Sequence, residues 1–165
     1  MPLRSRRAKQ QLEPTRQFLT FQIRGTSFAL AIESVQRVVP LGEVFPDPDH
    51  PQIRLTRYQD QTIRVLDGEQ QLFGKRSRTV NTQTFLQKWE LRDSQQYLLV
   101  LEGPNQTLSG LPITRQPGVR RIPLSKIEPV TQSHPGQNIP LFVQQMFETA
   151  EEETIFLIAL DRFLS

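Results

Sequence analysis

Residues Ile32 to Leu41 read IESVQRVVPL, and residues Ile113 to Leu124 read ITRQPGVRRIPL. Each segment begins with an apolar residue, continues with a polar stretch that contains arginine, and ends with an aliphatic residue followed by Pro-Leu. The two prolines are 83 positions apart (123 − 40). A second echo links IRVLDGEQQLF, which begins at Ile63, with IALDRFL, which begins at Ile158, at an aspartate offset of 94 (161 − 67). This short, degenerate repeat predicts two small β subdomains packed on each other.

The composition fits this prediction. A chain of 165 residues is one domain of ordinary size, or two very small ones that must share a core. Thirteen prolines and eight glycines are typical of short strands joined by turns. The absence of cysteine excludes disulfides and thiolate sites and favours a reducing compartment. Since no apolar run approaches the roughly 20 residues that span a bilayer, we expect a soluble, cytoplasmic protein.

The positive charge is concentrated at the N-terminus. The net charge of +3 includes Arg4, Arg6, Arg7 and Lys9, and without these four the remainder holds 16 basic and 17 acidic residues. We therefore expect residues 1–13 to form a flexible basic arm in front of a domain that spans residues 14–165.

Alternating apolar and polar residues predict antiparallel strands that begin near Phe18. Tight turns are expected at Gly25-Thr26, around Gln59-Asp60-Gln61 and at Asn105, and a polar connector near residues 75–83. Asp67 is expected to cap a short helix over Gly68–Phe73 that stops at Gly74, and the echoing Asp161 is expected to cap a helical stub in the same way.

No residue cluster suggests catalysis. The two histidines, His50 and His134, stand beside prolines in expected loops, and Asp47 and Asp49 near His50 lack a further ligand at suitable spacing. Phosphate-binding and nucleophile-elbow motifs are absent. We therefore predict no enzymatic activity and no catalytic, cofactor-binding or metal-binding site.

Four stretches, taken together in this order, carry a resemblance to a known family: FLTFQIRGTSFALAIESVQRVV, TIRVLDGEQQLFG, YLLVLEGPNQTLSGLPITRQPGVRRIPLSKIEPV and TIFLIALDRFL. Over residues 17–164 the chain thereby resembles the CheW family of chemotaxis coupling proteins. The resemblance implies a mainly β fold, in which two small five-stranded β-barrel subdomains are interleaved around a shared core with a few short helices. It also implies a non-catalytic adaptor that needs no cofactor.

The resemblance implies partners as well. Family members couple a CheA-like histidine kinase, through its regulatory domain, to the cytoplasmic tip of a methyl-accepting chemoreceptor-type protein. The output is chemotaxis, phototaxis or pilus motility, and membrane association is indirect, through the receptors. A different class of function is a nucleic-acid-binding β-barrel module that uses the basic arm; the near-neutral remainder and the lack of an aromatic stacking strip argue against it.

The chain departs from the family at the expected interfaces. Where the family has an Asn-Leu-Arg-Gly turn, this chain has Arg57-Tyr58-Gln59-Asp60, and where the family often has Val-x-Glu-Ile, it has Val-Gln-Arg-Val from Val35. One interpretation is a basic docking rim around Val35 and Leu55 for an acidic partner, and the other is a scatter of solvated charges. The predicted partner-binding residues are Val35, Arg37, Arg54, Leu55, Arg57, Gln59 and Asp60.

Overall fold

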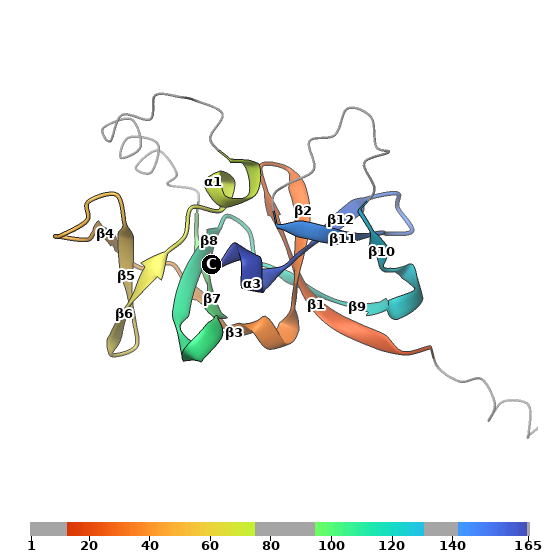
Figure 1. Ribbon diagram of the computed structural model, residues 1–165, viewed down its shortest axis with the longest axis horizontal. Helices are drawn as coiled ribbons and strands as arrows, with labels where there is room; N and C mark the ends of the chain where they lie inside the picture. Colours follow the sequence, from red (N-terminus) through yellow and green to blue (C-terminus); the bar gives the residue numbers. More distant parts are fainter. Residues whose placement is uncertain (1–12, 75–94, 131–141, 165) are drawn as a thin grey trace, which may run out of the picture.

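The computed structural model describes residues 13–74, 95–130 and 142–164. The expected arm up to residue 12, the connector near residues 75–83 and His134 lie outside these ranges. The described strands form two six-stranded sheets, seen side by side in Figure 1.

The first sheet, sheet A, has the strand order β10-β11-β12-β2-β1-β9. Its strands are β1 (Thr15–Ile23), β2 (Thr26–Ala31), β9 (Gly118–Pro123), β10 (Glu128–Pro129), β11 (Val143–Glu148) and β12 (Thr154–Ile158). The second, sheet B, has the order β3-β7-β8-β6-β5-β4. Its strands are β3 (Val35–Pro40), β4 (Val44–Pro46), β5 (Arg54–Tyr58), β6 (Gln61–Val65), β7 (Tyr97–Glu102) and β8 (Leu108–Ile113).

Five short helical segments accompany the sheets in the described residues. They are η1 (Ile32–Ser34), α1 (Gly68–Phe73), η2 (Pro104–Gln106), η3 (Leu124–Lys126) and α3 (Leu160–Phe163). The prediction of a mainly β protein with two parts around a shared core and short helices is confirmed, with six strands in each sheet where five were expected.

The two halves of the chain exchange a hairpin. The β1–β2 hairpin of the first half joins β9–β12 of the second half in sheet A, while the β7–β8 hairpin of the second half joins β3–β6 in sheet B. Within each sheet the incoming hairpin makes the parallel contact, β2 with β12 and β8 with β6. The two halves therefore have the same topology, but neither half is a subdomain by itself.

The sequence echoes have a structural counterpart in this exchange. The segments that end at Pro40 and Pro123 contain β3 and β9, each the edge strand that follows the crossing from one sheet to the other. The second echo is a strand followed by a helix, β6 and α1 in one half and β12 and α3 in the other. The repeat is thus a repeat of topology.

The β1–β2 turn lies one residue earlier than expected. Ile23 pairs with Thr26, so Arg24 and Gly25 form the two-residue turn, with φ of 53° and 75°. Positive φ at both central positions is what a twisted two-residue hairpin requires, and glycine adopts it without steric cost. Asn105, with φ of 58°, takes part in the β7–β8 turn as predicted.

Each sheet has its own apolar cluster, and the two share a third. Phe18, Ala29 and Leu157 belong to the cluster of sheet A, and Tyr58 and Leu98 to that of sheet B. The shared cluster is larger, since both sheets and both α-helices contribute to it: Leu19, Phe21, Ile23, Phe28, Leu30, Leu66, Leu72, Leu99, Leu101, Leu111, Ile113, Met146, Phe156, Ile158 and Phe163. Burial on both faces explains why the central strands are almost continuously apolar.

Helix α1 closes the seam between the sheets at Gly68. A Cβ atom there would lie 2.8 Å from Ile23 Cδ1 in sheet A and 2.9 Å from Leu111 Cδ1 in sheet B. On the same helix, Phe73 packs edge-on against Phe28 with ring centroids 6.0 Å apart. The absence of a side chain at Gly68 therefore lets the helix approach both sheets.

Of the two predicted caps, one is confirmed and one is wrong. The Asp67 carboxylate accepts a hydrogen bond from the Gln70 backbone N–H at 3.2 Å, and α1 ends at Gly74 as expected. Asp161 makes no capping bond, because α3 begins at Leu160 and places Asp161 inside its first turn. The cap position belongs to Ala159.

Candidate docking surfaces

The predicted partner-binding residues fall on two parts of sheet B. Val35 and Arg37 lie on β3, at one edge, and the others lie on or beside the β5–β6 hairpin. Between β3 and β5 stand β7, β8 and β6, so four strand spacings of about 4.8 Å separate them, about 19 Å along the sheet. Figure 1 shows the hairpin well apart from β3. A single basic rim around Val35 and Leu55 is therefore not formed.

We call the first part the β3 edge, defined by Val35, Arg37 and Val38. Val35 is half-buried against the shared core, whereas Arg37 is exposed and Val38 is 37% exposed. A register shift between Val35 and Arg37 interrupts the pairing with β7, which is typical of a β-bulge at a sheet edge. No residue in the described ranges makes an ion pair with Arg37. Arg37 and Val38 are consecutive and point to opposite faces of the sheet, so the edge offers a charge on one side and an exposed apolar side chain on the other.

We call the second part the hairpin face, defined by Leu55, Arg57, Thr62 and Arg64. Leu55 stands opposite Arg64 and Arg57 opposite Thr62, so all four side chains share one face. Leu55 is half-buried and the other three are exposed. Within the described residues neither Arg57 nor Arg64 has an ion-pair partner.

Arg54 differs from the other predicted residues. It points to the opposite side of β5, together with Thr56 and Tyr58, and is only 7% exposed. A side chain so deeply buried offers almost no surface to a partner. The hairpin turn consists of Gln59 and Asp60, both exposed, with Gln59 at φ of 53°.

Sequence reasoning missed Val38 as a surface residue and left Arg64 outside the predicted set. On β3, the exposed Val38 alternates with the half-buried Val39, which packs on the sheet B cluster. On β6, the exposed Arg64 separates the buried Ile63 and Val65. Period-two alternation carried on through each strand would have found both residues.

The loop before β5 has a structural explanation. The Asp47 carboxylate accepts hydrogen bonds from the backbone N–H groups of Asp49 and His50, at 2.8 and 3.3 Å. This local turn gives the Asp47 carboxylate a structural role that needs no metal ion. Among the described residues, no group of three or more acidic or histidine side chains is placed to hold a metal ion.

A hollow of about 510 Å³ lies where η1, η2 and α3 meet. Its acidic lining residues are Glu33, Glu102 and Asp161.

In the described part of the chain, no helix is long and apolar enough to cross a membrane.

Comparisons with known proteins agree with this architecture. The family model of the CheW-like domain matches residues 17–165. Among solved structures, the scaffolding protein TtCheW from Thermoanaerobacter tengcongensis superposes with a TM-score of 0.68 at 18% sequence identity, over 94% of this chain and 92% of that one. No curated protein sequence matches the chain. Because the family match covers nearly the whole chain, the protein belongs to the family of CheW-like domains, which are non-catalytic scaffolds.

Proposed function

We propose that this protein is an adaptor that couples a CheA-like histidine kinase to a chemoreceptor-type sensor, in a chemotaxis, phototaxis or pilus-motility pathway. The observation that carries the proposal is the separation of the β3 edge from the hairpin face across sheet B. A coupling protein must hold two partners at once, and two surfaces about 19 Å apart along the sheet allow this without direct competition.

The β3 edge is the proposed contact for the regulatory domain of the kinase. It presents unpaired strand hydrogen-bonding groups at the sheet edge, the exposed Val38 and the charge of Arg37. An exposed edge strand is a common template for pairing with another β protein. The regulatory domain that the resemblance implies is itself a β-barrel domain, so edge-to-edge docking fits its shape.

The hairpin face is the proposed contact for the receptor tip. The family's turn arginine is absent from its expected place, but Arg57 lies two residues away and is exposed, and Arg64 stands on the same face. Leu55 supplies apolar surface between β4 and β6, since it is paired with Phe45 on one side and Arg64 on the other. The pair of arginines favours an acidic partner surface.

Two charge reversals test the assignment. Arg37→Glu is expected to weaken binding of the kinase regulatory domain by about tenfold, equal to about 1.4 kcal/mol, and to leave receptor binding unchanged. Arg57→Glu is expected to do the reverse. Binding is measured by fluorescence anisotropy with the purified regulatory domain and a soluble receptor fragment.

Lys126→Glu is the matched control, since it makes the same charge change at an exposed residue of η3, next to sheet A. If each reversal weakens both partners equally, the two surfaces are not separate docking sites. If the folded wild-type chain binds neither partner at micromolar concentration, the adaptor function itself is refuted.

A further inference from the structure

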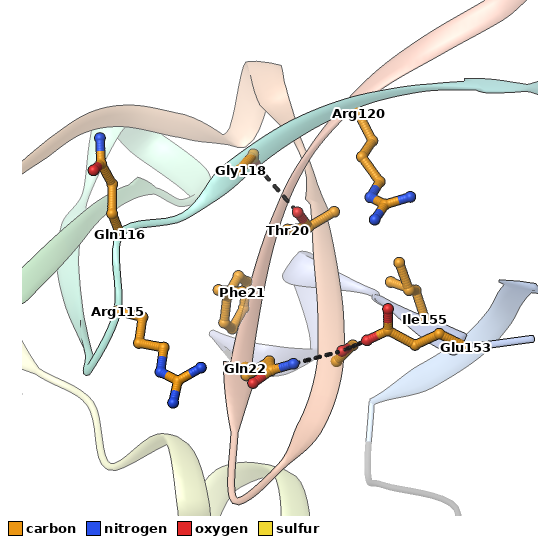
Figure 2. A pocket seen from close by; sticks show the side chains of 10 residues that line it. Thr20, Phe21, Gln22, Arg115, Gln116, Gly118, Arg120, Glu153 and Ile155 are labelled. Atoms are coloured by element: carbon orange, nitrogen blue, oxygen red, sulfur yellow. Dashed lines mark hydrogen bonds between the residues drawn. The ribbon is translucent and has the colours of Figure 1, made fainter. Parts of the chain in front are cut away.

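Sheet A carries a polar pocket that the adaptor function leaves unused. The pocket has a volume of about 260 Å³, and its lining comes from β1, β2, β9, β12 and the segments next to them. In the strand pairings, Gly118 stands opposite Thr20 and Ser27 opposite Gln22, so these side chains share the face of the sheet that the pocket occupies (Figure 2). Mouths of curved β-sheets are common ligand sites.

A chain of hydrogen bonds fixes one wall of the pocket. Gln22 Nε2 donates to Ser27 Oγ at 3.4 Å, and Ser27 Oγ donates to the Glu153 carboxylate. Ser27 is only 8% exposed, so the bond that it makes to Glu153 is largely shielded from water. Glu153, the one acidic residue among those that line the pocket, is thus hydrogen-bonded to a neighbouring lining residue, Ser27.

Two arginines face this wall without an acidic partner. Arg115 and Arg120 line the pocket from different sides in Figure 2, and within the described residues neither makes an ion pair, including with Glu153. The segment from residue 108 to residue 123 contains three arginines and no acidic residue. The pocket therefore has two guanidinium groups that make no ion pair within the described residues, and one carboxylate that is hydrogen-bonded to a serine hydroxyl.

The size and position of the pocket restrict what it can bind. At about 260 Å³ it holds a small group such as one carboxylate, and is below the usual range for a nucleotide or drug-sized molecule. It is bordered by β9, an edge strand whose residues from Gly118 to Arg121 are exposed and whose outer side is paired with no described strand. An extended peptide can align with such an edge and direct alternate side chains to the pocket face.

We propose that this pocket binds an acidic side chain of an extended protein segment that lies along β9, with the carboxylate held by the guanidinium group of Arg120, while Arg115 lies at the other end of the pocket. Guanidinium groups suit carboxylates because their fork of N–H donors matches the two oxygens. The site is on sheet A, whereas both surfaces of the proposed adaptor function are on sheet B, so the two proposals stand or fall separately.

The test is an NMR titration of the folded chain with the capped peptide Thr-Val-Glu-Val-Thr and its Thr-Val-Gln-Val-Thr counterpart. The glutamate peptide is expected to bind at least about tenfold more tightly, because the amide cannot form the charged pair. Arg120→Gln is expected to lower its affinity by about tenfold.

Arg121→Gln is the matched control, because it removes the same charge from the next residue of β9, whose side chain points to the other face. Equal losses for Arg120→Gln and Arg121→Gln would reduce the effect to general attraction by a basic edge and overturn the proposal. Absence of any shift with the glutamate peptide at about 1 mM would overturn it too.

Sodium acetate and inorganic phosphate form the remaining arms of the titration. If either anion shifts the resonances of the pocket at concentrations as low as the glutamate peptide does, the pocket is a free-anion site and the peptide assignment is wrong. If the peptide binds more tightly than both anions and also protects the amides of β9 from hydrogen exchange, the assignment is supported.

Discussion

Replacing Gly68 by alanine tests how tightly α1 seals the two sheets. The new methyl group would lie 2.8 Å from Ile23 Cδ1 and 2.9 Å from Leu111 Cδ1, well inside van der Waals contact. Overpacking of this kind costs about 1–3 kcal/mol, and the low end applies because both neighbours are terminal methyl groups that can shift. Because Gly68 is the first residue of α1, alanine recovers only a small part of the roughly 1 kcal/mol that it gains over glycine in a helix interior. We expect a net loss of about 1 kcal/mol in unfolding free energy.

A double-mutant cycle makes this reasoning specific. Ile23→Val removes the Cδ1 atom nearest to the new methyl group and by itself costs about 1 kcal/mol. In the Ile23→Val background, Gly68→Ala should cost at least about 0.5 kcal/mol less than in the wild type, because one of its two close contacts has gone. The measurement is urea unfolding followed by circular dichroism, with the unfolding free energies of all four proteins compared.

Gly42 provides the control. A Cβ atom there would have no neighbour within 4 Å, so Gly42→Ala should not lower the stability. If the effects of Gly68→Ala and Ile23→Val are additive, or if Gly42→Ala is as destabilising as Gly68→Ala, the contact between helix and sheets is not the cause.

Five further substitutions, in three comparisons, test the fold. Asp67→Ala should lower the unfolding free energy by about 1 kcal/mol because the helix cap is lost, and Asp161→Ala should lower it by less than about 0.5 kcal/mol. Urea unfolding measures both values. Equal losses would contradict the finding that only Asp67 caps its helix. Phe163→Ala, at a side chain 1% exposed in the shared core, should cost about 3–5 kcal/mol by the same assay, and a cost below about 1 kcal/mol would place it outside the core. Leu157→Asp should abolish the cooperative thermal transition because it buries an unpaired charge, whereas Val119→Asp, at a side chain 56% exposed, should retain that transition.

Local structure was largely predictable because it depends on neighbouring residues. Alternation located the strands, and the turn at Gln59 and Asp60 and the cap at Asp67 follow from side-chain chemistry within a few positions. Asp161 shows that a shift of one or two residues decides whether an aspartate can cap a helix. Helix α3 begins at Leu160, so the cap position belongs to Ala159 and Asp161 lies inside the first turn.

The pairing of distant strands was not predictable in the same way. Nothing local tells β7 and β8 to insert between β3 and β6, and it is this insertion that separates Val35 from Leu55 and prevents a common rim. Alternation places Arg54 and Leu55 on opposite faces of β5, but it does not by itself say that the arginine is the buried one of the two. Its burial follows from the side of β5 that it shares with Thr56 and Tyr58, which faces the interior of sheet B.

The exchanged hairpins have a consequence for how the molecule loses its structure. To separate the two sheets, the chain must withdraw β1 and β2 from the middle of one and β7 and β8 from the middle of the other, which leaves unpaired strands in both. Neither half can complete a sheet from its own strands, because each sheet contains a hairpin of the other half. We therefore expect both sheets to unfold in one cooperative transition, so that probes in sheet A and sheet B report the same midpoint.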